Sequence, residues 1–344
     1  MTDDIIFKKA TLALGGAVKL PEGFQVPVRV SHSTAGPGAG NDSAVFSFHG
    51  MRVKKSISYD SGEFELVLRP DGRYALTLNG EPFIGEIAFE PVVYHCPEQA
   101  FITIDSRCAY TCAFCASPRL PNSDYKGLSD EDIARKCVDA YREHKVVAVS
   151  LTSGVYNGDI QAEVDRFVSC ATLIRRELPD VLIGLEPYAE TEAQIKAMKD
   201  AGADEIKLNV QAATDEIFAR VCPDLNRERI FECLRHAVRY FGRGKVTSNI
   251  IYGMGETLEE LEACMDRICE IGAIPTVRSL RYNRYNGESL KAAIGVQEKV
   301  TPEYMVKVAE LHKAVLDRHG MDTNTCRTMC LECGCCDIVP HRDL

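Results

Sequence analysis

The stretch Phe101-Ile-Thr-Ile-Asp105 is followed closely by Cys108-Ala-Tyr-Thr-Cys112-Ala-Phe-Cys115. The first run is rich in branched apolar residues and predicts a strand, and the second places three cysteines on the loop behind that strand. Three thiolates on a loop at the carboxyl end of a strand fit one corner of a cubane iron–sulfur cluster. Because a cubane has four irons, one iron then keeps an open coordination position, which is what a metal centre needs to bind a substrate.

The same alternation of strand and helix continues along the chain. Strands are predicted at 101–105, 146–151, 181–185, 204–209, 246–252 and 276–282. Helices are predicted at 129–145, 159–178, 191–202, 226–241, 257–271 and 301–320, with Ser129, Thr191 and Thr301 as N-caps. Consecutive strand–helix units predict a parallel sheet, and six units are too few for a closed eight-stranded barrel. We therefore expect an α/β fold, a partial (β/α)6 TIM-type barrel, over residues 100–300.

The two ends of the chain have a different pattern. Residues 1–99 are expected to form a small antiparallel β domain, because two strand-like runs in 64–78 flank Pro70-Asp71-Gly72 and a second tight turn is predicted at Asn79-Gly80. The glycine-rich stretch 36–40 lacks the Lys-Ser/Thr of a phosphate-binding loop and is expected to be a flexible connection. Residues 301–344 are expected to form the last helix and a cysteine-rich tail.

Composition excludes several classes of protein. The 344 residues are 45% hydrophobic and 26% charged, as in globular proteins that bury a core, and the formal charge of -10 makes nucleic acid a poor partner. No apolar run approaches the roughly 20 residues that span a bilayer, and acids stand at the start where a signal peptide carries cations. We therefore expect a cytoplasmic protein without a membrane partner. Its 15 cysteines then indicate metal or redox chemistry instead of disulfides.

The three-cysteine loop, with an aromatic residue before its last cysteine and behind the first strand of a six-unit partial barrel, resembles the radical S-adenosylmethionine (SAM) superfamily. The resemblance covers roughly residues 100–295. It implies that Cys108, Cys112 and Cys115 hold a 4Fe-4S cluster whose open iron chelates the amino and carboxylate groups of SAM. It also implies that the reduced cluster cleaves SAM to methionine and a 5'-deoxyadenosyl radical, which abstracts a hydrogen atom. The alternative is zinc, which is disfavoured because no fourth cysteine or histidine lies near the loop in sequence.

The resemblance also implies contacts to SAM. Phe114 would lie near the adenine, and Thr152-Ser153-Gly154, where Val155 replaces the usual acid, would hold the amino group. Glu186, ending the third strand, is a candidate for the ribose hydroxyls, because a carboxylate accepts hydrogen bonds from a diol. The remaining candidates are Asn209, on a strand similar to one in biotin and lipoyl synthases, and Gly253 and Gly255, in a turn similar to the one that flanks the adenine there.

The tail holds a second group of cysteines, Cys326-Arg-Thr-Met-Cys330-Leu-Glu-Cys333-Gly-Cys335-Cys336. It looks like the ligand set of an auxiliary 4Fe-4S cluster, formed by Cys326, Cys330, Cys333 and Cys336, with Cys335 spare because the side chains of adjacent residues diverge. A closed zinc site is the alternative for this group. Cysteines that fall inside predicted helices are expected to be buried structural residues, and so is His95. These cysteines are Cys137, Cys170, Cys233, Cys264 and Cys269.

Two clusters on one SAM-cleaving barrel favour sulfur insertion into an unactivated C–H bond of an octanoyl or other acyl chain. The tail resembles that of the two-protein archaeal type of lipoyl synthase, which implies an acyl-carrying protein or peptide as substrate, a similar radical SAM protein as partner, and a low-potential electron donor such as ferredoxin. The barrel mouth is expected to hold the acyl chain, with Arg278, Arg281 or Tyr282 near it. The alternatives are a maturase that modifies a peptide or protein, with the second cluster accepting an electron, and a non-catalytic iron–sulfur or zinc protein.

Overall fold

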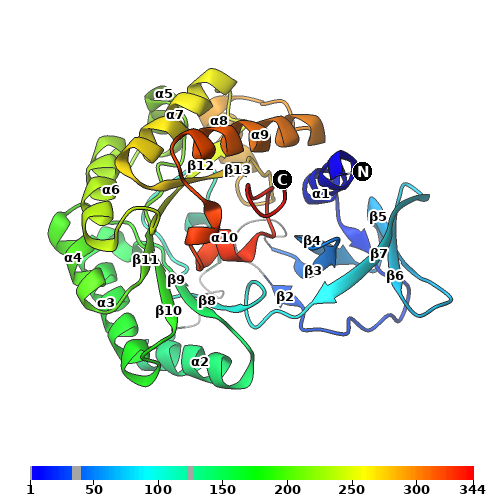
Figure 1. Cartoon of the computed structure of the whole chain (residues 1–344), viewed down its shortest axis with the longest axis horizontal. Helices are drawn as coiled ribbons and strands as arrows, with labels where there is room; N and C mark the ends of the chain where they lie inside the picture. Colours follow the sequence, from blue (N-terminus) through cyan, green and yellow to red (C-terminus); the bar gives the residue numbers. More distant parts are fainter. Residues whose placement is uncertain (1, 33–39, 122–124, 126) are drawn as a thin grey trace.

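The computed structural model describes residues 2–32, 40–121, 125 and 127–344, and its larger part is a partial barrel of parallel strands. The six strands are β8 (Gln99–Thr103), β9 (Ala148–Thr152), β10 (Leu182–Glu186), β11 (Glu205–Lys207), β12 (Val246–Tyr252) and β13 (Ile274–Ser279). They pair side by side in chain order, and every pair is parallel. The sheet curves with its helices on the outer side, and among the described strands β8 and β13 are the unpaired edges (Figure 1). The predicted partial (β/α)6 barrel is confirmed.

The outer helices begin where the sequence supplies a capping side chain. They are α2 (Asp130–Glu143), α3 (Ile160–Glu177), α4 (Glu192–Asp200), α5 (Asp215–Val221), α6 (Arg227–Phe241), α7 (Leu258–Ile271), α8 (Gly287–Ile294) and α9 (Pro302–Arg318). The predicted caps Ser129, Thr191 and Thr301 each accept a backbone N–H of the first turn. The sequence pattern did not predict α8, which has no side-chain hydrogen bond at its N-cap. Short 3-10 turns occupy Ser117–Arg119, Tyr156–Gly158 and Thr323–Thr325.

The N-terminal unit is a mixed sheet preceded by a helix. It contains α1 (Thr2–Leu14), β1 (Val18–Lys19), β2 (Ser31–His32), β3 (Asp42–Phe48), β4 (Met51–Ser58), β5 (Phe64–Leu68), β6 (Tyr74–Leu78) and β7 (Glu81–Glu90). The hairpin of β5 and β6 and the Asn79-Gly80 turn are confirmed, with positive φ at both turn residues. Two features differ from the expectation of a purely antiparallel domain: the helix α1, and the parallel pairing of β1 with β4 and β5. Most of the glycine-rich stretch 36–40 lies outside the described residues.

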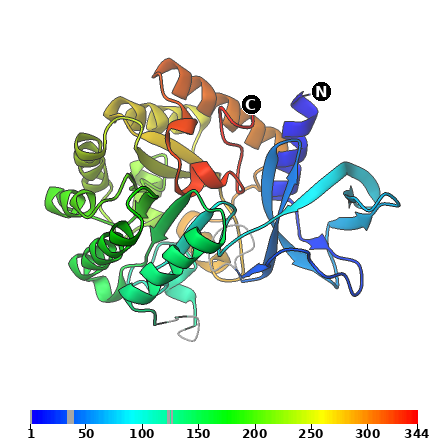
Figure 2. The ribbon, with the colours of Figure 1, turned by 60° about the horizontal axis from the view of Figure 1, so that its bottom comes forward.

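The C-terminal segment folds back into the barrel instead of trailing from it. After α9 the chain forms the short helix α10 (Met329–Cys333) between the barrel and the N-terminal sheet (Figures 1 and 2). It contacts the ends at which strands begin, since Thr328 Oγ1 donates to Glu205 (2.7 Å) and the Met329 amide donates to Gln99 (2.6 Å). Gly184 in β10 makes room for it, because a Cβ there would lie 2.2 Å from Thr328 Oγ1. The segment therefore forms the floor of the barrel, opposite the ends at which the strands finish.

Two large cores and a small cluster of Val45, Val92, Cys96, Cys333 and Cys335 hold the described parts together. One large core lies between the barrel strands and their outer helices, and the other joins α1, the N-terminal sheet and part of α9. No helix among the described residues is long and apolar enough to cross a membrane.

Candidate functional site

The three-cysteine loop leaves β8 at the open mouth of the barrel and is fixed from several sides. The Cys115 amide donates to the Cys112 carbonyl (3.1 Å), and Arg119 Nη1 donates to both of these residues' carbonyls, at 2.7 and 3.0 Å. The turn after α5 holds the other side, because Asp224 accepts from the amide and the hydroxyl of Thr111, each at 2.6 Å. These contacts hold the loop in a tight arc that carries all three thiols.

The segment Thr152-Ser153-Gly154, at the end of β9, runs directly beside this loop. The Gly154 amide donates to the Asp105 carbonyl (2.8 Å), and the Val155 amide donates to Cys108 Sγ (3.4 Å). A side chain at 154 is impossible without a shift, because a Cβ there would lie 2.2 Å from the Arg107 carbonyl oxygen. The requirement for glycine is thus steric. The structure brings this predicted cofactor segment into contact with the cysteine loop.

A carboxylate that the sequence pattern did not nominate lies behind this segment. Glu163, in the first turn of α3, is buried and accepts a hydrogen bond from Ser153 Oγ. Its burial raises the pKa of the carboxyl group, against the effect of the serine hydrogen bond. Val155 stands where the resemblance leads us to expect an acid. Glu163 is a buried acid that contacts the segment Thr152-Ser153-Gly154 from behind. The N-cap signal at Asp159 could have pointed to it, since an acid in the first helical turn faces the preceding loop.

The predicted residues Glu186 and Asn209 meet inside the barrel. Asn209 Nδ2 donates to Glu186 Oε1 (2.8 Å), and Asn209 Oδ1 accepts the Asn249 amide (3.1 Å). Lys207 Nζ forms an ion pair with Glu186 Oε1 at 3.1 Å. Glu186 is therefore held at the end of β10 with one side occupied by these partners.

The glycine turn after β12 is held by the side chain of Glu256 and packs against Val300. Gly253 and Gly255 both have positive φ, and Glu256 accepts from the amides of Gly253 (2.5 Å) and Met254 (3.0 Å). A Cβ on Gly253 would lie 2.7 Å from Val300. Phe114 lies across the mouth, partly buried against the barrel core, with its carbonyl accepting from Asn286 at the start of α8 (3.0 Å).

The fold brings a fourth thiol to the loop. Cys222, at the end of α5, donates a hydrogen bond to Cys112, and this bond lowers the pKa of the Cys112 thiol. The sequence argument against zinc considered only residues near the loop along the chain, and it overlooked this contact. Cys222 directly follows α5 and lies more than 100 positions after the loop, so no spacing pattern connects the two. A closed zinc site at the loop would include Cys222 as its fourth ligand.

The second group of cysteines lies at the barrel floor. Cys330 Sγ is 3.1 Å from Lys207 Nζ and also hydrogen-bonds with Arg278. Cys333 hydrogen-bonds with Cys335 and with Cys96, which belongs to the linker before β8. Cys336 is next to Cys330 and Cys333, and burial raises the pKa of its thiol to about 12. Cys326, predicted as a ligand, lies apart, with its thiol donating to the Gly244 carbonyl at 3.0 Å.

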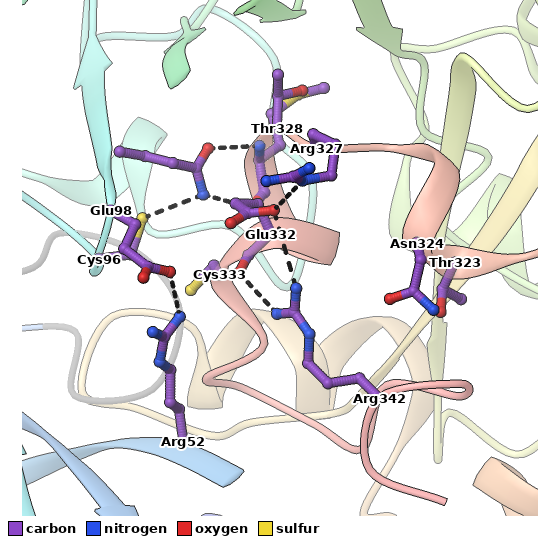
Figure 3. Close-up of polar contacts among 12 residues, drawn as sticks. Arg52, Cys96, Glu98, Thr323, Asn324, Arg327, Thr328, Glu332, Cys333 and Arg342 are labelled. Atoms are coloured by element: carbon purple, nitrogen blue, oxygen red, sulfur yellow. Dashed lines mark hydrogen bonds and ion pairs between the residues drawn. The ribbon is translucent and has the colours of Figure 1, made fainter. Parts of the chain in front are cut away.

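Arginine side chains fix the C-terminal segment that forms the floor of the barrel. Arg342 Nη1 donates to the Glu332 carbonyl (2.7 Å), and Arg327 Nε donates to the Glu332 carboxylate (3.2 Å) (Figure 3). Arg281, expected near an acyl chain, instead donates to the carbonyls of Ala13 (2.7 Å) and Cys336 (3.2 Å), so it ties the tail to α1. Tyr282 is exposed.

The donor chemistry of both groups fits iron–sulfur clusters. Soft thiols dominate each group, and thiolates are the ligands that such clusters take from proteins. Among the described residues no three His, Cys, Asp or Glu side chains are gathered so closely that they would hold a single metal ion. The cysteines expected to be structural are buried, and His95 is partly buried. These cysteines are Cys137, Cys170, Cys233, Cys264 and Cys269.

Comparison with known proteins agrees with this geometry. Residues 102–268 match the radical SAM superfamily. A biotin synthase from a Nitratiruptor species is 28% identical over 168 residues, which are 48% of this chain and 58% of that protein. A lipoyl synthase from Ectopseudomonas mendocina is 22% identical over 229 residues, 63% of each chain. The chain thus spans less than two thirds of the length of these curated relatives.

Two solved structures share the fold. Methylornithine synthase has a TM-score of 0.52 at 16% identity, covering 62% of both chains. The FeFe-hydrogenase maturase from Carboxydothermus hydrogenoformans has a TM-score of 0.53 at 17% identity, covering 64% of this chain and 51% of the other. The thiol loop thus lies at the mouth of a six-stranded parallel barrel, residues 102–268 of this chain match the radical SAM superfamily, and the chain is similar to a biotin synthase and a lipoyl synthase.

Proposed function

We propose that this protein is a radical SAM enzyme that inserts sulfur into an unactivated C–H bond of an acyl chain, as a lipoyl synthase-type sulfurtransferase. One observation carries the proposal: two groups of thiols lie at opposite ends of a single barrel lumen. The group at the mouth, Cys108, Cys112 and Cys115, has the SAM segment beside it, and the group at the floor includes Cys330, Cys333 and Cys336. A substrate held between them would face both.

Cys108, Cys112 and Cys115 would hold the cluster that passes one electron from a low-potential donor to SAM. The thiols at the floor would hold a second cluster, which would supply the sulfur for the new C–S bond and accept the electron that this bond formation releases. The chain's own residues bind and orient. Gly154 lets the backbone approach the loop, and we infer that the Glu186 carboxylate, fixed by Asn209, accepts from the ribose hydroxyls of SAM.

Residues of the lumen separate the two thiol groups. Lys207 and Arg278 contact Cys330, and Glu186 and Asn209 stand on the mouth side of Lys207. A positive charge at the Cys330 sulfur stabilises negative charge on that sulfur, whatever metal it binds. We therefore infer that Arg278 acts on the floor group, and the acyl chain would run past Lys207 and Asn209 toward it.

The similarity to a lipoyl synthase supports an octanoyl group on a lysine of a partner protein as the substrate. Two sulfurs are needed for a lipoyl group, so a second, similar radical SAM protein would share the work. The electron donor would be a low-potential protein such as ferredoxin.

The test is anaerobic reconstitution of the protein followed by incubation with SAM, a low-potential reductant and an octanoyl-lysine peptide. Formation of 5'-deoxyadenosine and of a thiolated peptide supports the proposal. Replacing Cys108, Cys112 and Cys115 together with alanine should abolish 5'-deoxyadenosine, and replacing Cys330 and Cys333 should stop thiolation while SAM cleavage continues. SAM cleavage with a modified but sulfur-free peptide would favour the maturase alternative, and no SAM cleavage by a fully loaded protein would favour a non-catalytic one.

A further inference from the structure

We propose that Cys96, which lies outside the cysteine-rich tail, is the fourth ligand of the auxiliary cluster, together with Cys330, Cys333 and Cys336, and that Cys326 is not a ligand. The inference deepens the proposed function and rests on its second cluster. It assigns a ligand that joins the linker before β8 to the C-terminal segment.

The spacing within the tail supplies three of the ligands. Cys330, Cys333 and Cys336 are each separated by two residues. A Cys-x2-Cys-x2-Cys run gives three thiolates to one 4Fe-4S cluster in bacterial ferredoxins, and the fourth ligand then comes from another part of the chain. Cys326, four residues before Cys330, falls outside this spacing.

Cys96 is the thiol that the fold brings to this run. Its side chain is fully buried, hydrogen-bonds with Cys333, and packs with Cys333 and Cys335 against Val45 and Val92. Gln99 fixes the approach of the two segments: its Nε2 lies 3.7 Å from Cys96 Sγ and donates to the Met329 carbonyl at 2.9 Å. Figure 3 shows Cys96 and Cys333 on the same side of α10.

Cys326 has surroundings that disfavour a thiolate. Its thiol donates to the Gly244 carbonyl, and the neighbouring carboxylate of Glu205, which is fully buried, raises the pKa of the thiol together with burial. Glu205 accepts from Thr328 Oγ1 and the Arg327 amide, so its carboxylate is fixed close to this sulfur. A second negative charge there would be repelled in a medium of low dielectric constant. The nearby cation, Lys245, pairs with the Glu205 carboxylate at 3.1 Å, so its charge is already balanced by that carboxylate.

Buried cations surround the proposed ligands. Lys207 and Arg278 contact Cys330, and Lys54 reaches the same group from β4, with its backbone amide donating to the Cys335 carbonyl at 2.9 Å. Lys54 and Lys207 are almost completely buried. Burying positive charge is costly unless negative charge lies close by, and a cluster with four thiolate ligands is an anion. Lys207 also pairs with Glu186 at 3.1 Å and Arg278 with Asp337 at 3.8 Å, so these two cations are shared between carboxylates and the floor thiols.

Cys335 is the competitor for the fourth position. It contacts Cys333 and Cys96, but its thiol donates to the Cys333 carbonyl at 3.1 Å. We therefore assign Cys335 a structural role, in which its thiol stabilises the turn between Cys333 and Cys336 through this hydrogen bond.

The experiment counts iron in a background that lacks the first cluster. In full-length protein carrying Cys108→Ala, Cys112→Ala and Cys115→Ala, anaerobic reconstitution should give about four irons and four sulfides per chain. Adding Cys96→Ala should leave three thiolates and one open iron, as expected for the loop at the mouth. Mild oxidation should then release that iron and give the electron paramagnetic resonance signal of a three-iron cluster, which the protein with Cys96 should not give. Adding Cys326→Ala or Cys335→Ala should leave about four irons, as should Cys170→Ala, a buried cysteine of α3 that serves as the matched control.

The assignment is overturned if Cys96→Ala keeps four irons and gives no three-iron signal after mild oxidation, or if Cys326→Ala or Cys335→Ala loses iron. Cys96→Ser keeps the volume of the side chain, and circular dichroism of each variant separates loss of a ligand from loss of folding. If the iron counts follow the assignment but no thiolated peptide forms, the proposed function fails while the ligand set stands. Tightly bound zinc in place of iron overturns both.

Discussion

Lys207 Nζ, on the last residue of β11, lies 3.1 Å from Cys330 Sγ of the floor segment and 3.1 Å from Glu186 Oε1 of β10. Burial lowers the pKa of this ammonium group, but the negative charges of Cys330 and Glu186 outweigh burial and raise it overall. Lys207 is therefore a charged group through which the barrel wall holds both the C-terminal segment and a predicted SAM contact.

Replacing Lys207 with methionine should destabilise the protein by about 3–5 kcal/mol, because it leaves the Glu186 carboxylate buried without its cation. The double variant Lys207→Met/Glu186→Gln should recover part of this loss, since no uncompensated charge remains. Denaturant unfolding of the wild type, both single variants and the double variant measures the coupling. Strictly additive losses would show that the two side chains do not interact in solution.

Replacing Gly154 with alanine should displace the cysteine loop, because the new Cβ would meet the Arg107 carbonyl at 2.2 Å. Forced overpacking of this kind costs about 1–3 kcal/mol, and here the strain falls on the backbone next to Cys108. We expect weaker SAM binding and less iron at the loop, measured by equilibrium dialysis and iron analysis. Gly85→Ala in β7, where a Cβ would contact nothing within 4 Å, is the matched control and should change neither value.

Replacing Cys222 with alanine should leave the iron content of the loop unchanged, because we assign Cys222 as a hydrogen-bond donor to Cys112 and not as a ligand. Loss of a hydrogen bond to a cluster sulfur should make the reduction potential of that cluster more negative. Potentiometric titration monitored by electron paramagnetic resonance checks this, with Cys137→Ala in α2 as the control. A loop that binds zinc in the wild type and loses it in Cys222→Ala would instead establish a closed four-cysteine site.

Acid should destabilise the protein through His312 of α9. Burial lowers the pKa of this imidazole to about 4, below its ordinary 6.5, and Nε2 contacts the Pro275 carbonyl at 2.9 Å. Between those values the unfolded chain binds more protons than the folded one, so this contribution to stability is complete above about pH 6.5 and declines as the pH falls toward 4.

His312→Gln can still donate to the Pro275 carbonyl but does not titrate. The wild type should lose about 1 kcal/mol more stability than this variant between about pH 7.5 and about pH 5.5, measured as the shift of the denaturant midpoint. Parallel curves for the two proteins would show that His312 is not the responsible group.

Most of the barrel could be predicted from the sequence, because its elements carry local signals. Ser129, Thr191 and Thr301 cap helices where their side chains lead us to expect caps, and apolar runs mark all six strands. The helices α1, α8 and α10 were missed. In α8 the N-cap residue makes no side-chain hydrogen bond, so its start has no local marker, and the helix is defined by its contacts with the cysteine loop.

The sequence by itself determined the class of the protein: a three-cysteine loop behind the first strand, at a spacing that needs no folded structure to be recognised, within a run of strand–helix units. Only the tertiary structure decided which distant thiols contact these two cysteine groups. It brings Cys222 to Cys112 and Cys96 to Cys333, and it directs the Cys326 thiol toward the Gly244 carbonyl. The physical reason is that spacing reports only on ligands that share one loop. Contacts between residues more than 100 positions apart depend on how strands and the returning C-terminal segment pack, and no local pattern records that packing.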